Sequence, residues 1–214
     1  NVGLGDCIYL RVPDKEREVH ILIDCGNKFA KQDQLDGCIE HMKQELPEAG
    51  AGKKRLDLLV VSHPHEDHHK GFEEKLFEDL KIEHIWLSPA FGDETLESKG
   101  FNALYKAVGR AVEGLDSLSK SAQAALSDDV RELLSLSKSE ALQMLKFTLP
   151  EKNKIDPLYT YADTPESKLK IFKDETIKLK VLGPMSDIDR FYLGGEGLMS
   201  TSEEITTSAM ETGY

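Results

Sequence analysis

LDLLVVSHPHEDHHKGF, residues 56–72, joins a nearly continuous apolar run to a cluster of four histidines and two acids. The apolar run predicts a buried strand, and the cluster begins where that strand ends. In extended backbone, side chains two positions apart point the same way, so His63 and His65 are placed to hold one ion together. Asp67 and His68 lie one turn further on, where the chain bends into a helix, and reach a second position. Imidazole nitrogen and carboxylate oxygen suit zinc and its first-row neighbours, so the pattern predicts a metal site rather than a solvated polar loop.

The residues upstream of this cluster predict a β-hairpin. Two β-rich runs, residues 7–12 and 19–23, are separated by the polar turn PDKE at 13–16, which is the pattern of paired strands. Asp6 and Asp24 fall at the ends of these strands. Each is explained equally well as a turn or capping aspartate or as a group that orients metal ligands from behind.

With these flanks, the cluster resembles a known family. HPHEDHH, residues 63–69, fits the HxHxDH signature of the metallo-β-lactamase-fold hydrolases. VGLGDCIYLRV (2–12) followed by HILIDCGN (20–27) is similar to the opening hairpin of that superfamily, most closely of its competence-type, DNA-uptake branch. The resemblance covers residues 2–90 well and 169–184 loosely. It implies an α/β fold, the metallo-β-lactamase-type αββα sandwich, whose front half is clear and whose back half is missing or supplied elsewhere.

The resemblance also implies a role for each site residue. His63 and His65 would hold the first of two divalent metal ions, zinc or else manganese, and Asp67 and His68 the second. Asp67 would also lie next to the activated water and is therefore the candidate catalytic residue. Asp6 and Asp24 would orient the ligands. His69, which adjoins His68, occupies a position where relatives often carry an apolar residue, and we expect it to orient a ligand or contact the substrate.

Composition limits the class of protein. The 214 residues suffice for one domain, or for a domain with an insertion. No apolar run approaches the roughly 20 residues that a membrane helix needs. The net charge of −12 argues against a stand-alone nucleic-acid binder, and only weakly against a nuclease. Cys7, Cys25 and Cys38 indicate reduced core thiols, so we expect a cytoplasmic protein with no membrane contact.

The rest of the chain divides by composition. Residues 1–92 form the metal-binding half. Within it we predict an amphipathic helix at 33–46 and a second helix whose apolar residues run from Phe72 to Leu80. A strand follows at 82–89, in which we expect His84 to face the sheet. Residues 93–150 predict a helical insertion, which would form a lid, a substrate-selecting wall, a partner surface or mere packing. Residues 151–193 continue the strands of the same domain, with a hairpin at 169–184. Residues 194–214 are a flexible acidic tail or a truncated segment.

Several ligands that the resemblance requires are not found in the sequence. The family needs a third metal-binding histidine, a bridging aspartate and a final histidine, and no histidine follows His84. We therefore expect one of three explanations: the chain is the front half of a longer protein, a partner chain completes the fold, or the site is degenerate. The intact HxHxDH motif favours the first two explanations.

Two classes of function follow. The first is a metal-dependent hydrolase that uses a metal-activated water, and the resemblance favours a phosphodiesterase or nuclease acting on nucleic acid or nucleotides. A lactonase or thioesterase remains open on the same scaffold. The alternative is a non-catalytic or partner-activated subunit of a larger complex, with a degenerate metal site and a helical insertion that contacts a protein partner.

Overall fold

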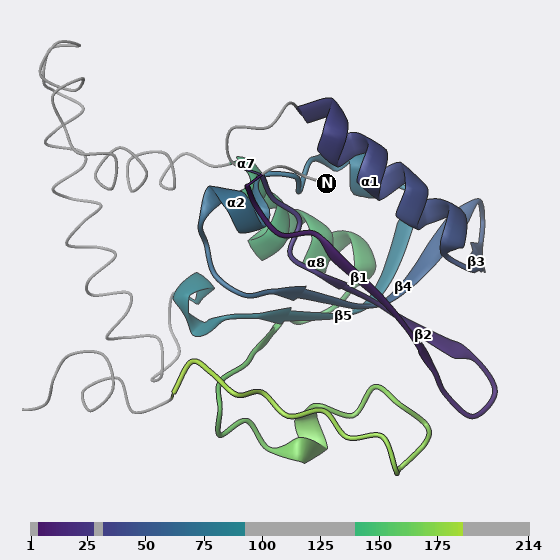
Figure 1. Cartoon of the computed structure of the whole chain (residues 1–214), viewed down its shortest axis with the longest axis vertical. Helices are drawn as coiled ribbons and strands as arrows, with labels where there is room; N and C mark the ends of the chain where they lie inside the picture. Colours follow the sequence, from purple (N-terminus) through teal and green to yellow (C-terminus); the bar gives the residue numbers. More distant parts are fainter. Residues whose placement is uncertain (1–3, 28–31, 93–139, 186–214) are drawn as a thin grey trace, which may run out of the picture.

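The computed structural model describes residues 4–27, 32–92 and 140–185 (Figure 1). In these residues a six-stranded sheet has the order β1-β2-β4-β5-β6, with β3 paired to β4. The strands are β1 (Ile8–Pro13), β2 (Glu18–Ile23), β3 (Glu48–Gly50), β4 (Lys53–Val61), β5 (Leu80–Leu87) and β6 (Leu158–Tyr159). The strands β2, β4, β5 and β6 are parallel, whereas β1 and β3 are antiparallel to their neighbours. The fold is therefore mixed α/β, as expected.

The predicted N-terminal hairpin is confirmed. β1 pairs with β2 from Ile8 opposite Ile23 to Pro13 opposite Glu18, and the Asp14 N–H closes the turn on the Arg17 carbonyl at 2.9 Å. β2 is buried along most of its length, because it lies between β1 and β4. The carboxyl ends of parallel strands meet at one edge of a sheet, which is where ligands bind in open α/β folds. The end of β2 therefore lies beside the end of β4, where the histidine cluster begins.

One face of the sheet carries the main core. The helix α1 (Gln32–Glu45) confirms the amphipathic pattern, since Leu35, Ile39 and Met42 are buried, while Cys38 is half-buried and His41 is exposed. The same core cluster includes residues of α3 (Glu74–Phe77) and of a helical run made of α7 (Glu140–Gln143), the π-helical η2 (Met144–Thr148) and α8 (Leu149–Asn153). This run is fastened to β5, because the Asn153 side-chain oxygen accepts the Ile82 N–H at 2.9 Å.

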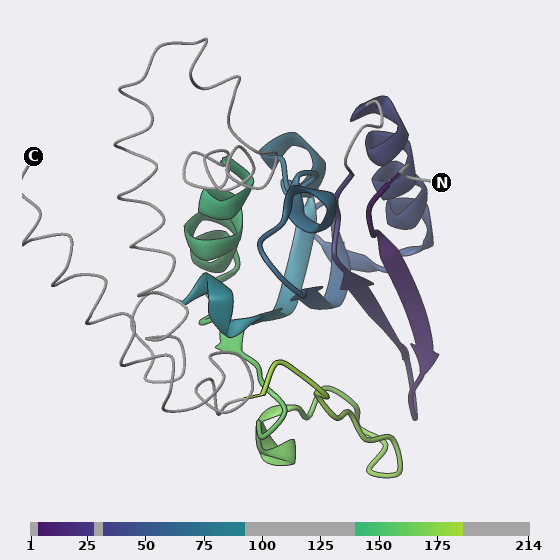
Figure 2. The same cartoon turned by 60° about the vertical axis from the view of Figure 1, so that its left-hand side comes forward.

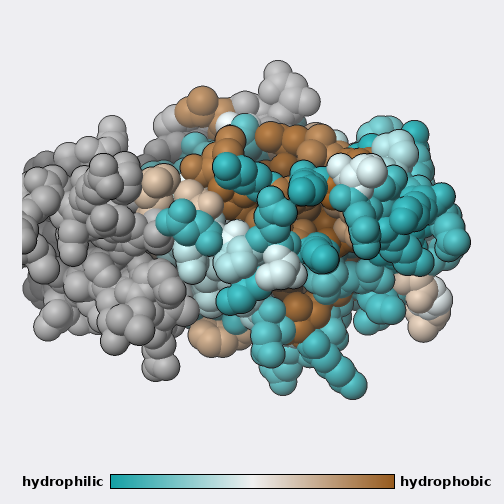
Figure 3. Space-filling view, turned by 90° about the horizontal axis from the view of Figure 1, so that it is seen from below, coloured by the Kyte–Doolittle hydropathy of each residue, from teal (hydrophilic) through white to brown (hydrophobic). Residues whose placement is uncertain are grey.

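The opposite face is covered by the segment that follows β6, which includes η3 (Glu166–Lys168). In Figures 1 and 2 this yellow-green segment lies below the strands, away from α1 and α8. Its Leu169 and Ile171 pack with Leu58 and Trp86 of the sheet. A mostly apolar cleft of about 260 Å³ lies between residues 179–184 and the sheet, and Figure 3 shows hydrophobic surface between polar groups on this side.

The structure corrects three local predictions. The hairpin at 169–184 is wrong, because these residues form no strand, although their apolar positions still pack on the sheet. The helix after the motif is reduced to single turns, α2 (Glu66–His69) and α3, because Leu80 already opens β5 opposite Lys54. His84 is exposed on β5 rather than packed.

The remaining predictions fall mostly outside the described residues. The insertion at 93–150 is described only from residue 140, where the chain is helical, and the tail at 194–214 is not described. After β5 the chain makes one short turn, η1 (Pro89–Phe91), before the described part of this region ends. Among the helices that the structure describes, none has the length and apolar character needed to cross a membrane.

Candidate metal centre

Two of the motif histidines, His63 and His65, lie on the loop between β4 and α2, and His68 and His69 belong to α2 itself. His63 precedes Pro64, and a residue before proline is held in extended backbone. His65 is also extended, with φ −90° and ψ 148°. The rings of His63 and His65 consequently lie near each other, with centroids 4.6 Å apart and planes at 80°. The predicted placement of these two side chains on one side of the loop is thus present in the structure.

Three residues of the motif converge as possible ligands. His63, Asp67 and His68 each offer one ligand atom, and these atoms all lie within 4.8 Å of one another. The His63 and His68 ring centroids are 3.8 Å apart, and His68 Nε2 lies 3.6 Å from Asp67 Oδ2. Two imidazole nitrogens and one carboxylate oxygen form a donor set of the zinc type, so these residues fit a divalent transition-metal ion.

His65 stands slightly apart from this group. Its side chain is exposed, and among the described residues it belongs to neither cluster of possible ligand atoms. The second of these clusters is formed by Asp6, Asp24 and His68. The structure therefore brings together three of the four predicted ligands and places the fourth beside them, next to His63.

Asp24 holds the ligand loop through its buried carboxylate, which is 3% exposed. Its Oδ1 accepts the Ser62 backbone N–H at 2.7 Å, and its Oδ2 accepts the Ser62 hydroxyl at 2.6 Å. The same Oδ2 lies 2.9 Å from His68 Nδ1. Asp6 is more distant, with its Oδ2 3.5 Å from His68 Nδ1. A carboxylate that binds the Nδ1–H of a histidine leaves Nε2 as the ligand atom, and here Nε2 of His68 is the nitrogen that faces Asp67.

Backbone hydrogen bonds clamp the same loop to the ends of β1 and β2. The Asp6 N–H donates to the Asp67 carbonyl at 2.9 Å, and the Cys25 N–H donates to the His68 carbonyl at 2.8 Å. Gly26 lies so close to this crossing that a Cβ there would come within 2.3 Å of the Asp67 carbonyl carbon. Only glycine fits at such an approach. The opening hairpin and the motif are consequently one structural unit, although the residues that these bonds join lie far apart in the chain.

His69 faces away from the ligand group. Its side chain is 1% exposed, and its Nδ1–H donates to the His65 carbonyl at 2.5 Å. Burial is the main reason that the pKa of His69 is lowered, which keeps the ring neutral near pH 7. In this position the side chain supports the backbone of the ligand loop from the core side and does not join the three converging ligands.

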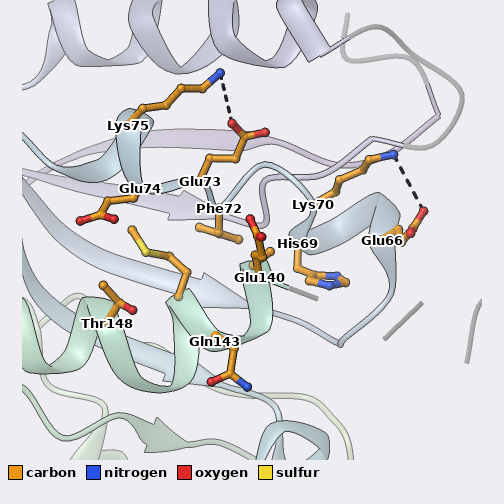
Figure 4. Close-up of a pocket in the computed structure, with 12 residues that line it drawn as sticks. Glu66, His69, Lys70, Phe72, Glu73, Glu74, Lys75, Glu140, Gln143 and Thr148 are labelled. Carbon is orange, nitrogen blue, oxygen red and sulfur yellow. Dashed lines mark ion pairs between the residues drawn. The ribbon is translucent and has the colours of Figure 1, made fainter. Parts of the chain in front are cut away.

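A cavity of about 640 Å³ lies on the side of α2 that carries Glu66 and His69. Figure 4 shows their side chains with that of Glu140 of α7, and the ion pairs of Lys70 with Glu66 and of Lys75 with Glu73. Glu66 and His69 are three positions apart and share one face of the helical turn. The cavity is therefore separate from the group that His63, Asp67 and His68 form.

The surroundings of His63 favour its neutral imidazole. The pKa of His63 is lowered, first by burial and then by the neighbouring His68 and His65. A neutral imidazole has a lone pair for metal binding, whereas an imidazolium has none. Protonation of His63 is unfavourable chiefly because its ring is withdrawn from water, and secondly because the rings of His68 and His65 lie next to it.

Ser62 is the site residue that the sequence did not single out. Besides its two bonds to Asp24, its hydroxyl lies 2.9 Å from His63 Nδ1 and 3.5 Å from His68 Nδ1. The sequence did hold a usable signal. Asp24 directly follows β2, and Ser62 directly follows β4, the parallel neighbour of β2. Recognising it requires knowledge that β2 and β4 are adjacent.

The comparisons with known proteins agree with the histidine motif. The family model of the Metallo-beta-lactamase superfamily matches residues 1–74, about a third of the chain, from the opening strand to the start of α3. No curated protein and no solved structure matches the chain significantly. The match says nothing of the competence-type branch. The mixed α/β sheet is consistent with a metallo-β-lactamase-type fold, and residues 1–74 are similar to a superfamily of metal-dependent hydrolases.

Proposed function

We propose that this protein is a metal-dependent hydrolase whose divalent ions, zinc or manganese, are held by His63, Asp67 and His68, with His65 completing the set. The convergence of three ligand atoms within 4.8 Å carries this proposal. Support comes from the family match, which contains the whole motif. It also comes from Asp24, which orients His68 with Nε2 toward Asp67.

The chain's own residues would prepare this chemistry in defined ways. When bound, a divalent ion polarises the bond to be cleaved and makes water a nucleophile at neutral pH. Burial lowers the pKa of His63, which favours the neutral ring whose nitrogen lone pair can bind an ion. Asp67 supplies negative charge on the same side as the two imidazoles. The backbone clamp holds its carbonyl, and hence the position of its side chain, against the end of β1.

For the substrate we propose a phosphodiester, in nucleic acid or in a nucleotide. The likeness of the opening hairpin to the competence-type branch supports this choice, and two ions suit the in-line displacement of a phosphodiester. With a net charge of −12 the chain does not attract phosphate as a whole. Positive potential would have to come from the ions at the site.

Metal content tests the site, and two substrates test the reaction. The natural protein would be dialysed against zinc or manganese, analysed for bound metal, and compared with His63→Ala and Asp67→Asn. His41→Ala is the matched control, because His41 is an exposed histidine on α1. We expect metal in the natural protein and in the control, and loss in both site variants. Metal retained by Asp67→Asn and His63→Ala alike would overturn the proposed site.

The substrate class is decided separately. Bis(p-nitrophenyl) phosphate would be compared with p-nitrophenyl acetate and a simple lactone in the metal-loaded protein. Faster turnover of the phosphodiester, lost in Asp67→Asn, is the expected result. Turnover of the ester or lactone alone would retain the hydrolase and refute the phosphodiesterase.

A non-catalytic or partner-activated subunit is the second candidate. The exposed side chain of His65, outside the three-residue group, favours it. This function predicts that metal binds weakly and that none of the three substrates is cleaved by the protein alone. It also predicts that His65→Ala leaves assembly with a protein partner intact, which co-purification from the natural source would measure.

A further inference from the structure

We infer that Ser62 is a positioning residue whose hydroxyl determines which nitrogen of His63 is free to bind metal. The inference rests on the proposed metal site and adds to it a residue outside the HxHxDH motif. Ser62 lies at the end of β4, directly before the motif, and its hydroxyl contacts Asp24 and His63 at once, at 2.6 and 2.9 Å.

The protons in this chain of contacts can be assigned one by one. At neutral pH an aspartate carboxylate only accepts hydrogen bonds, so the Ser62 hydroxyl donates its single proton to Asp24 Oδ2. Its oxygen can then only accept from His63 Nδ1, which must therefore carry a proton. A neutral imidazole has one N–H, and Nε2 of His63 is left with the lone pair. The nitrogen available for a metal is thus decided by a carboxylate that does not touch His63.

The same carboxylate acts on both histidines of the ligand group. Asp24 Oδ2 accepts directly from His68 Nδ1, at 2.9 Å, and reaches His63 through the Ser62 hydroxyl. Both imidazoles consequently present Nε2. Groups that orient metal ligands in this way typically change metal affinity 10- to 100-fold when they are removed.

Removal of the hydroxyl is a limited perturbation. The Ser62 backbone N–H, which donates to Asp24 Oδ1 at 2.7 Å, remains in any substitution other than proline. Ser62 is itself exposed, so a change of side chain opens no cavity in the core. Asp24 also keeps its bond to His68. We therefore expect the ligand loop to keep its backbone position, while Nδ1 of His63 loses its acceptor.

The experiment compares Ser62→Ala, Ser62→Thr and Ser62→Val. Threonine keeps the hydroxyl and valine replaces it with a methyl group of similar size, so this pair stays informative if alanine disturbs folding. Ser88→Ala is the control, because Ser88 follows β5 at the same edge of the sheet, with its N–H on the Val61 carbonyl at 3.1 Å. Each variant would be checked by urea unfolding.

The first readout is the tautomer of His63 in the metal-free protein, measured above pH 7.5 by long-range ¹H–¹⁵N NMR of the imidazole nitrogens. We expect the Nδ1–H form in the natural protein, Ser62→Thr and Ser88→Ala. The alanine and valine variants should show a mixture or the Nε2–H form. An unchanged Nδ1–H tautomer in folded Ser62→Ala and Ser62→Val would overturn the inference.

The second readout is zinc affinity by competition with a chromogenic chelator. A 10- to 100-fold loss is expected for the alanine and valine variants and none for Ser62→Thr. If the natural protein binds no zinc, the proposed function fails, while the tautomers of the metal-free protein still decide the role of Ser62. If zinc binds and the tautomer does not respond, only the role of Ser62 is refuted.

Discussion

Replacing Asp24 by asparagine is the sharpest test of how the hairpin organises the ligand loop. The carboxylate is 3% exposed and accepts three hydrogen bonds, two from Ser62 and one from His68. Asp24 has a positive φ of 57°, a backbone conformation that asparagine tolerates as well as aspartate does. Asparagine therefore changes the charge and the hydrogen bonding but leaves the backbone unstrained.

The expected magnitude follows from these contacts. The asparagine oxygen can still accept the Ser62 backbone N–H, but its NH₂ group replaces the oxygen that accepted the Ser62 hydroxyl and His68 Nδ1–H. Two hydrogen bonds to a charged acceptor, each worth about 1.5–3 kcal/mol, are lost. Because Ser62 is exposed and its hydroxyl can turn to accept instead, we expect a loss of about 2–4 kcal/mol in the free energy of unfolding.

The effect on metal binding has a separate cause. His68 can keep a hydrogen bond to the new NH₂ group only by moving its proton from Nδ1 to Nε2, the nitrogen that faces Asp67. Zinc affinity should then fall about 10- to 100-fold. Urea unfolding of the metal-free protein and competition with a chelator measure the two effects independently.

Asp14→Asn is the matched control for this variant. Asp14 also accepts backbone N–H groups, from Lys173 at 2.9 Å and Asp174 at 2.7 Å, but it lies in the turn of the hairpin, at the end of β1 distant from the motif. The Asp14→Asn substitution should therefore leave zinc affinity unchanged. Natural stability and natural zinc affinity in Asp24→Asn would refute the claim that Asp24 orients the ligand loop.

Three further predictions concern other parts of the fold. Gly26→Ala should destabilise the protein and weaken zinc binding, because the added Cβ would meet the Asp67 backbone. Unfolding followed by circular dichroism measures the stability, and zinc titration measures the affinity. Natural values for both would contradict this prediction. The pKa of His20 is lowered in the folded protein, chiefly by burial, so the unfolded state binds more protons. The contribution of His20 to the free energy of unfolding should therefore be complete above about pH 6.5 and should fall as the pH drops below it. His20→Gln should flatten that dependence in urea titrations at several pH values, and an unchanged slope would exclude His20 as its source. Leu59→Ala, in the core, should lower the free energy of unfolding by about 2–5 kcal/mol. Leu182→Ala, at a position that is 81% exposed, should lower it by less than about 0.5 kcal/mol. Equal unfolding midpoints for the two variants would contradict the assigned core.

Local sequence patterns were sufficient where local physics decides the structure. The hairpin of β1 and β2 follows from two β-rich runs and a polar turn, and α1 follows from apolar residues at helical spacing.

The segment 169–184 shows where local patterns were insufficient. Its alternation of apolar and polar residues predicted a hairpin, but no strand forms there. Alternation records which side chains are buried, and Leu169 and Ile171 are buried, but it does not show whether the backbone has a partner strand.

The sequence by itself determined the chemistry of the site. HPHEDHH places imidazoles and a carboxylate at the end of a buried strand, and extended backbone before Pro64 directs two of the rings to one side. Only the tertiary structure decided how these groups are held. The parallel pairing of β2 with β4 brings Asp24 to Ser62 and His68, and the core packing turns His69 to the other side of α2. These contacts join residues far apart in the chain, so they depend on strand order and close packing, which residue spacing does not contain.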